Sequence, residues 1–133
     1  MPSIERFEDI QSWQKGRELC RLVYAMSREG AFGRDYGLQD QMRRAGVSII
    51  SNIAEGFESQ NNRSFVRYLY IARASAAELR AQAYVALDQG YITQEQFTQL
   101  YELCRDVARL LTRFIAYLER HPAPISSALQ TEN

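Results

Sequence analysis

The spacing of apolar residues constrains the fold of this 133-residue chain more than any other feature. Apolar side chains recur every three or four positions over four long segments, which places them on one face of an α-helix. The segments run from about Phe7 to Glu29, from Tyr36 to Phe57, from near Arg63 to Gln89, and from Thr93 to Leu118. No segment shows the apolar–polar alternation of a β-strand. The sequence therefore predicts an all-α protein.

The connections between these segments are short and contain turn residues. The separating stretches are Gly30–Gly33, Glu58–Asn62 and the region around Gly90. Helices of about 25 residues would form rods about 37 Å long. Short connections between such rods favour antiparallel neighbours, and we expect an antiparallel up-down-up-down four-helix bundle.

The segment ends carry helix-capping signals. Asn62 is the expected N-cap of the third helix, and Thr93 with Gln96 has the spacing of a capping box. Pro122 and Pro124 forbid continuation of the fourth helix. We therefore assign residues 1–121 to the bundle domain and expect residues 122–133 to form a disordered C-terminal tail.

Composition narrows the possible partners and compartment. Sixteen basic residues balance sixteen acidic ones, which argues against a generic, strongly basic nucleic-acid binder. Fifteen of the basic residues are Arg, a bias that suits phosphate or interface contacts and that a GC-rich genome would also produce. The chain has no apolar run of membrane-spanning length and no signal-peptide pattern at its start. We expect a cytoplasmic protein with no membrane partner.

Groups for catalysis or metal binding are scarce in the sequence. His121 is the only histidine and follows the last helix, so no Glu-x-x-His pair exists. Cys20 and Cys104 are the only cysteines, and their helical spacing predicts two reduced, buried thiols. No glycine-rich phosphate loop is present. We therefore expect neither an enzyme nor a resident cofactor or metal.

A polar stripe runs along the second helix and is matched on the third. Its members, spaced by three and four, are Gln41, Arg44, Ser48, Asn52 and Glu55 on the second helix, with Ser75 and Glu78 on the third. If the stripes face each other, Glu78 could pair with an Arg or Asn of the second helix. One interpretation is a buried polar network that fixes helix register. The other is a ligand-binding seam or a subunit contact.

The run from Gln41 to Gly56 resembles the signature of the 23S rRNA intervening-sequence proteins. Phe7–Ile10 followed by Trp13, and the stretch Ala74–Leu79, resemble the opening and third helix of that family. The similarity covers about residues 4–120. It implies a small four-helix bundle that assembles as a ring, a homopentamer, with a genetic link to ribosomal RNA.

The same broad family includes the accessory variability protein of diversity-generating retroelements, for which the resemblance implies binding to nucleic acid and to a reverse transcriptase. One departure weakens a nucleic-acid contact after the signature run. The family has small and basic residues there, whereas this chain has Glu58-Ser59-Gln60.

Three hypotheses follow for function. The first is a non-catalytic homo-oligomer that binds structured RNA, with Arg43, Arg63, Arg67 and Arg73 as the contact residues; the alternative for each arginine is a solvated surface side chain. The second is a protein–protein scaffold or accessory factor, since Tyr and Arg are enriched at interfaces. The third, a small-molecule carrier or enzyme, rests only on the polar stripe.

Overall fold

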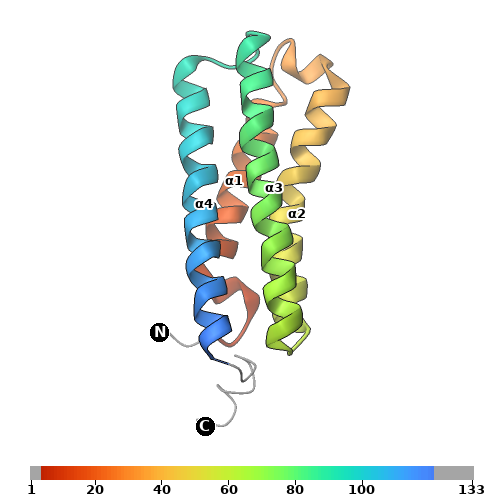
Figure 1. The fold of residues 1–133 in the computed structure, drawn as a ribbon. Helices are drawn as coiled ribbons and strands as arrows, with labels where there is room; N and C mark the ends of the chain where they lie inside the picture. Colours follow the sequence, from red (N-terminus) through yellow and green to blue (C-terminus); the bar gives the residue numbers. More distant parts are fainter. Residues whose placement is uncertain (1–3, 122–133) are drawn as a thin grey trace.

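The computed structural model describes residues 4–121 and consists of four long helices. They are α1 (Gln11–Met26), α2 (Tyr36–Glu58), α3 (Asn62–Asp88) and α4 (Gln94–Arg120), with short 3₁₀ turns η1 (Phe7–Asp9) and η2 (Phe32–Arg34). The helices run side by side along one long axis (Figure 1). No strand occurs among the described residues. The predicted all-α four-helix bundle is confirmed.

Helices that are neighbours in sequence are also neighbours in space. α1 packs on α2, α2 on α3 and α3 on α4, and the ring closes where α1 packs on α4. In Figure 1, α3 and α4 lie in front of α1 and α2. The α1–α2 side and the α3–α4 side are therefore opposite faces of the bundle.

The first helix differs from the predicted span of residues 7–29. Phe7–Asp9 form a 3₁₀ turn, Ile10 is extended (φ −78°, ψ 124°), and the α-helix covers only Gln11–Met26. The helical spacing of Phe7 and Ile10 was therefore misleading, because both side chains reach the core from a turn and an extended residue. Apolar periodicity indicates which side chains face the core. It does not distinguish a continuous helix from a helix that is preceded by a turn, and we call the turn formed here by residues 5–10 the hook.

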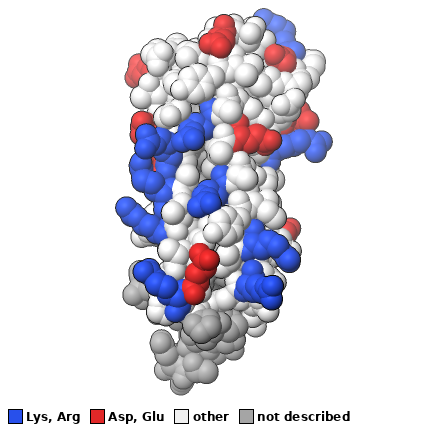
Figure 2. Space-filling model, viewed as in Figure 1, with Lys and Arg blue, Asp and Glu red and all other residues white. Residues whose placement is uncertain are grey.

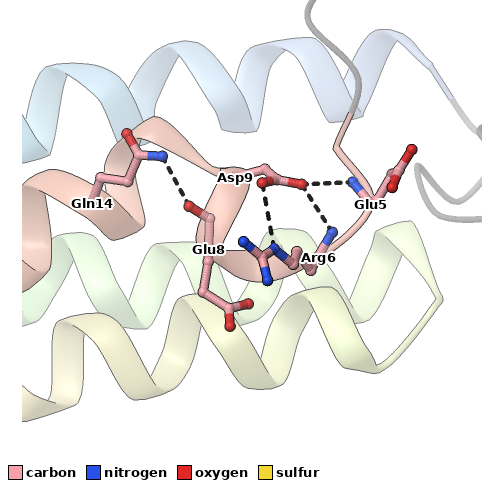
Figure 3. A network of polar contacts seen from close by, with 5 residues as sticks. All are labelled: Glu5, Arg6, Glu8, Asp9 and Gln14. Carbon is pink, nitrogen blue, oxygen red and sulfur yellow. Dashed lines mark hydrogen bonds and ion pairs between the residues drawn. The ribbon is translucent and has the colours of Figure 1, made fainter.

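A small polar network holds this hook in place (Figure 3). The Asp9 carboxylate accepts hydrogen bonds from the backbone N–H groups of Glu5 and Arg6, at 3.1 and 3.3 Å, and pairs with the Arg6 side chain at 3.7 Å. The Gln14 amide donates to the carbonyl of Glu8 at 2.8 Å. These bonds give partners to backbone groups that precede the first turn of α1.

The core is a continuous apolar layer along the bundle axis. The predicted seam of α4 is buried at every position, namely Phe97, Leu100, Cys104, Val107, Leu111, Phe114 and Leu118. On α3 the buried side chains include Ala72, Ala76, Ala83 and Ala86, which allow neighbouring helices to approach closely. Gly56 has the same effect on α2, because a Cβ there would lie 2.7 Å from Cδ1 of Phe65.

The helix caps match the sequence prediction at α4 and differ by one residue at α3. Thr93 and Gln96 form the expected capping box, with reciprocal hydrogen bonds of 3.1 and 2.8 Å. Asn61, rather than Asn62, caps α3 by accepting from the backbone N–H of Ser64. Asn62 instead donates to the carbonyl of His121 and joins the start of α3 to the end of α4. The tail predicted for residues 122–133 lies outside the described residues.

None of the helices within residues 4–121 has the length and apolar character needed to cross a membrane.

Candidate nucleic-acid interface

The outer side of the α3–α4 pair carries a groove lined with arginines, here called the α3–α4 groove. Its arginines are Arg73 and Arg80 of α3 and Arg105, Arg109 and Arg113 of α4. Its floor contains the small side chains of Ala76, Ala77 and Ala108. Two adjoining hollows of about 330 and 300 Å³ make up the groove. Figure 2 shows this face, with basic side chains gathered over its middle and lower parts.

Helical geometry explains why these arginines share one face. Successive residues are separated by about 100° around a helix axis. Arg73 and Arg80 are therefore about 20° apart on α3, and the arginines at positions 105, 109 and 113 of α4 follow one another at steps of about 40°. The close packing of α3 on α4 places the two rows beside each other.

Contacts with neighbouring side chains orient part of this arginine set. Arg73 donates to the hydroxyl of Thr112 at 3.1 Å, and its guanidinium lies 4.8 Å from the ring centre of Tyr70. The Arg80 guanidinium lies 5.5 Å from the ring centre of Tyr101. Such contacts reduce the side-chain freedom that binding would otherwise remove.

The groove keeps most of its positive charge. Arg109 pairs with Asp106, while no ion pair within residues 4–121 involves the other four arginines. The Arg109–Asp106 pair is itself about half exposed, so solvent screens it. The groove therefore attracts anions although the formal net charge of the whole chain is zero.

Two exposed tyrosines flank the arginines. Tyr70 is 44% exposed and Tyr84 is 50% exposed, and both lie on α3. The Tyr84 ring packs against Phe97 with a centroid distance of 4.8 Å, which fixes its position. Fixed aromatic rings beside arginines are the groups on which unpaired bases stack.

Cys104 is part of the floor of the α3–α4 groove, and its thiol has low reactivity. Burial raises the pKa of the Cys104 thiol to about 12, and the nearby positive charge of Arg80 only partly opposes this. Burial also raises the pKa of the Cys20 thiol. Both thiols are therefore protonated at neutral pH, and a protonated thiol is a poor nucleophile.

The four arginines predicted from the sequence do not form one site. Arg73 lies in the α3–α4 groove. Arg63 and Arg67 are exposed near the start of α3. Arg43 lies on the α1 side of α2, where its guanidinium is 4.5 Å from the ring centre of Tyr24.

Sequence reasoning missed the contribution of α4 to the groove. Arg105, Arg109 and Arg113 recur at every fourth residue, a signal that was available in the sequence. The same helix has as many acidic as basic residues, so its net charge is zero. The net charge therefore does not reveal that these three arginines share one face.

The predicted polar stripe divides into a central cluster and exposed ends. Ser48 and Ser75 hydroxyl oxygens lie 2.8 Å apart, and the Asn52 amide donates to the carbonyl of Ser48 at 2.8 Å and to its hydroxyl at 3.0 Å. Arg44 pairs with Asp40 at 2.8 Å, on the surface of α2.

The other three members of the stripe, Gln41, Glu55 and Glu78, are exposed. Within residues 4–121, no hydrogen bond or ion pair joins Glu78 to an Arg or Asn of α2. The part of the stripe that the structure brings together is therefore the Ser48–Ser75–Asn52 cluster.

Metal-ligating side chains do not converge in the described part of the chain. No group of three or more His, Cys, Asp and Glu residues within residues 4–121 is placed to hold a metal ion.

Comparison with known proteins places the fold among related sequences. Residues 8–113 match the family described as 23S rRNA-intervening sequence protein. A solved structure with a TM-score of 0.72 and 25% sequence identity covers 79% of this chain and 95% of its own. It is a protein of unknown function from the S23 ribosomal protein family of Bacteroides thetaiotaomicron VPI-5482. No curated protein sequence matches the chain significantly.

The family match spans α1 to α3 entirely and most of α4, and thus both the signature run in α2 and the arginine rows of α3 and α4. A match of this extent establishes family membership. The chain belongs to the 23S rRNA-intervening sequence protein family.

Proposed function

We propose that this protein binds structured RNA through the α3–α4 groove, as a non-catalytic homo-oligomer in the cytoplasm. The observation that carries the proposal is the convergence of five arginines from two helices on two hollows floored by alanines. The small floor residues leave room for a phosphate chain to approach the guanidinium groups.

The chemistry of the groove matches RNA with unpaired bases. A guanidinium offers a planar fork of donors that fits a phosphate group. Tyr70 and Tyr84 are 14 residues apart on one helix, which corresponds to about 21 Å. The arginines between them would hold the backbone while bases from a loop or bulge stack on the two rings.

Family membership supports RNA as the polyanion. The family description names an rRNA intervening sequence, which places the relatives in an RNA context. The similar solved structure is of a protein with unknown function. The family description is therefore the reason to propose RNA rather than DNA. The arginines of the α3–α4 groove are the reason to propose a polyanion.

The oligomeric part of the proposal has a separate physical basis. Val47 of α2 and Ile71 and Val85 of α3 are 39–46% exposed, and none lines the α3–α4 groove. A homopentamer that covers such side chains would present five copies of the groove. Several weak sites on one particle raise the apparent affinity for a long RNA without new contacts.

RNA binding is tested by anisotropy of a fluorescein-labelled RNA stem-loop titrated with protein at several salt concentrations. The variant is R105Q/R109Q/R113Q, and the matched control is R34Q/R44Q/R120Q, which removes three exposed arginines outside the groove. We expect the groove variant to lose at least about tenfold in affinity. Its log K against log [salt] slope should be shallower by about 2, because each lost phosphate contact removes about 0.7–0.9 from the slope.

Equal affinity and equal slope for the groove variant and the wild type would overturn the proposal. Light scattering on a sizing column tests the assembly in the same preparation. A homopentamer gives five times the 15.4 kDa subunit mass. A wild-type oligomer with no RNA affinity at any salt concentration would instead favour the scaffold hypothesis.

A further inference from the structure

A second row of arginines lies on the opposite side of the bundle. Arg17 and Arg21 of α1, with Arg28 in the turn that follows it, border a hollow of about 420 Å³ between α1 and α2. Arg17 and Arg21 are about 40° apart around the axis of α1, and Arg28 lines the same hollow from beyond the end of the helix. We call this hollow, together with Arg43 of α2 at its edge, the α1–α2 groove.

Arg43 is held in place by contacts on two sides. Its Nε donates to the hydroxyl of Ser27 at 2.9 Å, and its guanidinium lies over the Tyr24 ring at 4.5 Å from the centre. Ser27 is fully buried, so the acceptor of this part-buried hydrogen bond is held in a fixed position. A guanidinium has five N–H donors, and this bond uses one of them. The cation is thus oriented before any ligand arrives.

The positive charge of this second row is not neutralised locally. No ion pair within residues 4–121 involves Arg17, Arg21, Arg28 or Arg43. The acidic neighbour Glu18 pairs instead with Lys15 at 3.5 Å. Three exposed arginines (Arg17, Arg21 and Arg28) and the partly exposed Arg43 therefore leave this side of the bundle positively charged.

The two grooves cannot be parts of one small site. The α1–α2 and α3–α4 sides are opposite faces of the bundle (Figure 1). One helix is about 10 Å in diameter, so two layers of helices separate the grooves by about 20 Å. A short RNA strand bound in one groove would leave the other accessible.

We infer that the α1–α2 groove is a second RNA site that binds the sugar–phosphate backbone, so that each subunit can bridge two RNA segments. The ligand class rests on the proposed function of the α3–α4 groove.

The two grooves differ in how they would read RNA. Arginines lie over one ring in each groove, Arg43 over Tyr24 and Arg73 over Tyr70. Tyr24 is only partly exposed, whereas Tyr70 and Tyr84 beside the α3–α4 groove are both exposed. The second site therefore offers cations and less aromatic surface for stacking than the α3–α4 groove. Such a site holds the backbone irrespective of sequence.

The test counts binding sites per subunit with a fluorescein-labelled RNA hexamer, titrated at low salt and at protein concentrations well above Kd. We expect two equivalents for the wild type and one for R17Q/R21Q/R28Q. The variant R105Q/R109Q/R113Q should also bind one, and the sextuple variant none. Circular dichroism melting of each variant identifies any loss of folding.

The inference is overturned if the wild type binds one hexamer, or if R17Q/R21Q/R28Q still binds two. A single wild-type site that only R105Q/R109Q/R113Q removes would refute the second groove and leave the proposed function intact. A single site that only R17Q/R21Q/R28Q removes would refute the α3–α4 groove and with it the bridging.

Discussion

The hydroxyl groups of Ser48 and Ser75 meet 2.8 Å apart across the contact between α2 and α3. Asn52 adds a third group, since its amide also donates to the Ser48 hydroxyl. A half-buried hydrogen bond between two short side chains requires one relative position of the two helices along their axes. The cluster therefore fixes the register of α2 on α3.

The Ser48→Ala and Ser75→Ala substitutions should both weaken this cluster, by different amounts. We expect Ser75→Ala to lower the free energy of unfolding by about 1 kcal/mol, and Ser48→Ala by more, because Ser48 has two partners. Urea unfolding of both single variants and the double variant measures the coupling. Strictly additive losses would show that the two hydroxyls do not interact.

Gly56 should not tolerate a larger side chain. A Cβ at this position would lie 2.7 Å from Phe65 Cδ1 and 2.9 Å from Tyr68 Cβ, so α2 and α3 would have to separate. We expect Gly56→Ala to cost about 1–3 kcal/mol in urea unfolding. Gly37→Ala is the matched control, because the nearest atom to its Cβ is 3.8 Å away. Equal stability of the two variants would contradict this interpretation.

The capping box should determine the stability of the start of α4. Thr93→Ala removes the side-chain acceptor for the Gln96 N–H, and we expect a loss of about 1 kcal/mol in thermal or urea unfolding. Thr98→Ala, on the exposed surface of the same helix, serves as the control. Alanine has the higher helix propensity, so Thr98→Ala should not destabilise α4, and a loss as large as that of Thr93→Ala would contradict the capping interpretation.

Tyr91 should make stability sensitive to alkaline pH. Its hydroxyl donates to the Asp35 carboxylate at 2.9 Å, and this bond raises the pKa of Tyr91 above its ordinary value of 10.0, with burial and the charge of Asp35 adding to the rise. The bond stabilises the folded state below pH 10, and this stability is lost as the pH rises through the higher folded pKa. The difference in unfolding free energy between wild type and Tyr91→Phe should therefore be larger at pH 8 than at pH 11. A constant difference would show that the bond is not formed in solution.

The two cysteines should differ in reactivity. Cys20 borders the hollow of the α1–α2 groove, whereas Cys104 is 1% exposed and burial raises its pKa to about 12. We expect iodoacetamide at pH 8 to label Cys20 before Cys104 in the folded protein, as read by peptide mass spectrometry. In urea the two rates should become similar. Faster labelling of Cys104 in the absence of urea would mean that the α3–α4 contact opens readily.

The sequence determined the number and order of helices because apolar periodicity is a local property. The fourth segment shows this best, since every predicted seam residue of α4 is buried. The start of α1 was not predictable in the same way. Phe7 and Ile10 have helical spacing, yet the hydrogen bonds of Asp9 convert this stretch into a hook. That choice depends on side-chain bonds that a periodicity count does not include.

The candidate site was less predictable because it depends on two helices at once. Each arginine row is visible in its own segment, but a row becomes a groove only when packing brings it beside another. Arg73 and Thr112 are 39 residues apart. Their hydrogen bond depends on the relative position of α3 and α4 along their axes, which neither helix determines alone. The arrangement of the polar stripe also depends on how two helices pack, so it could not be predicted from one segment. Short side chains such as Ser48 remain at the helix contact, whereas the longer Gln41 and Glu55 extend into water.

The order of packing around the bundle has a consequence for folding kinetics. Three of the four helix contacts join consecutive helices and require only short loops to close. The α1–α4 contact joins the two ends of the chain, so its loop entropy is the largest. We expect this seam to close last during folding and to open first in the native state, with the 16-residue α1 exchanging its amide hydrogens faster than the 27-residue α3 and α4.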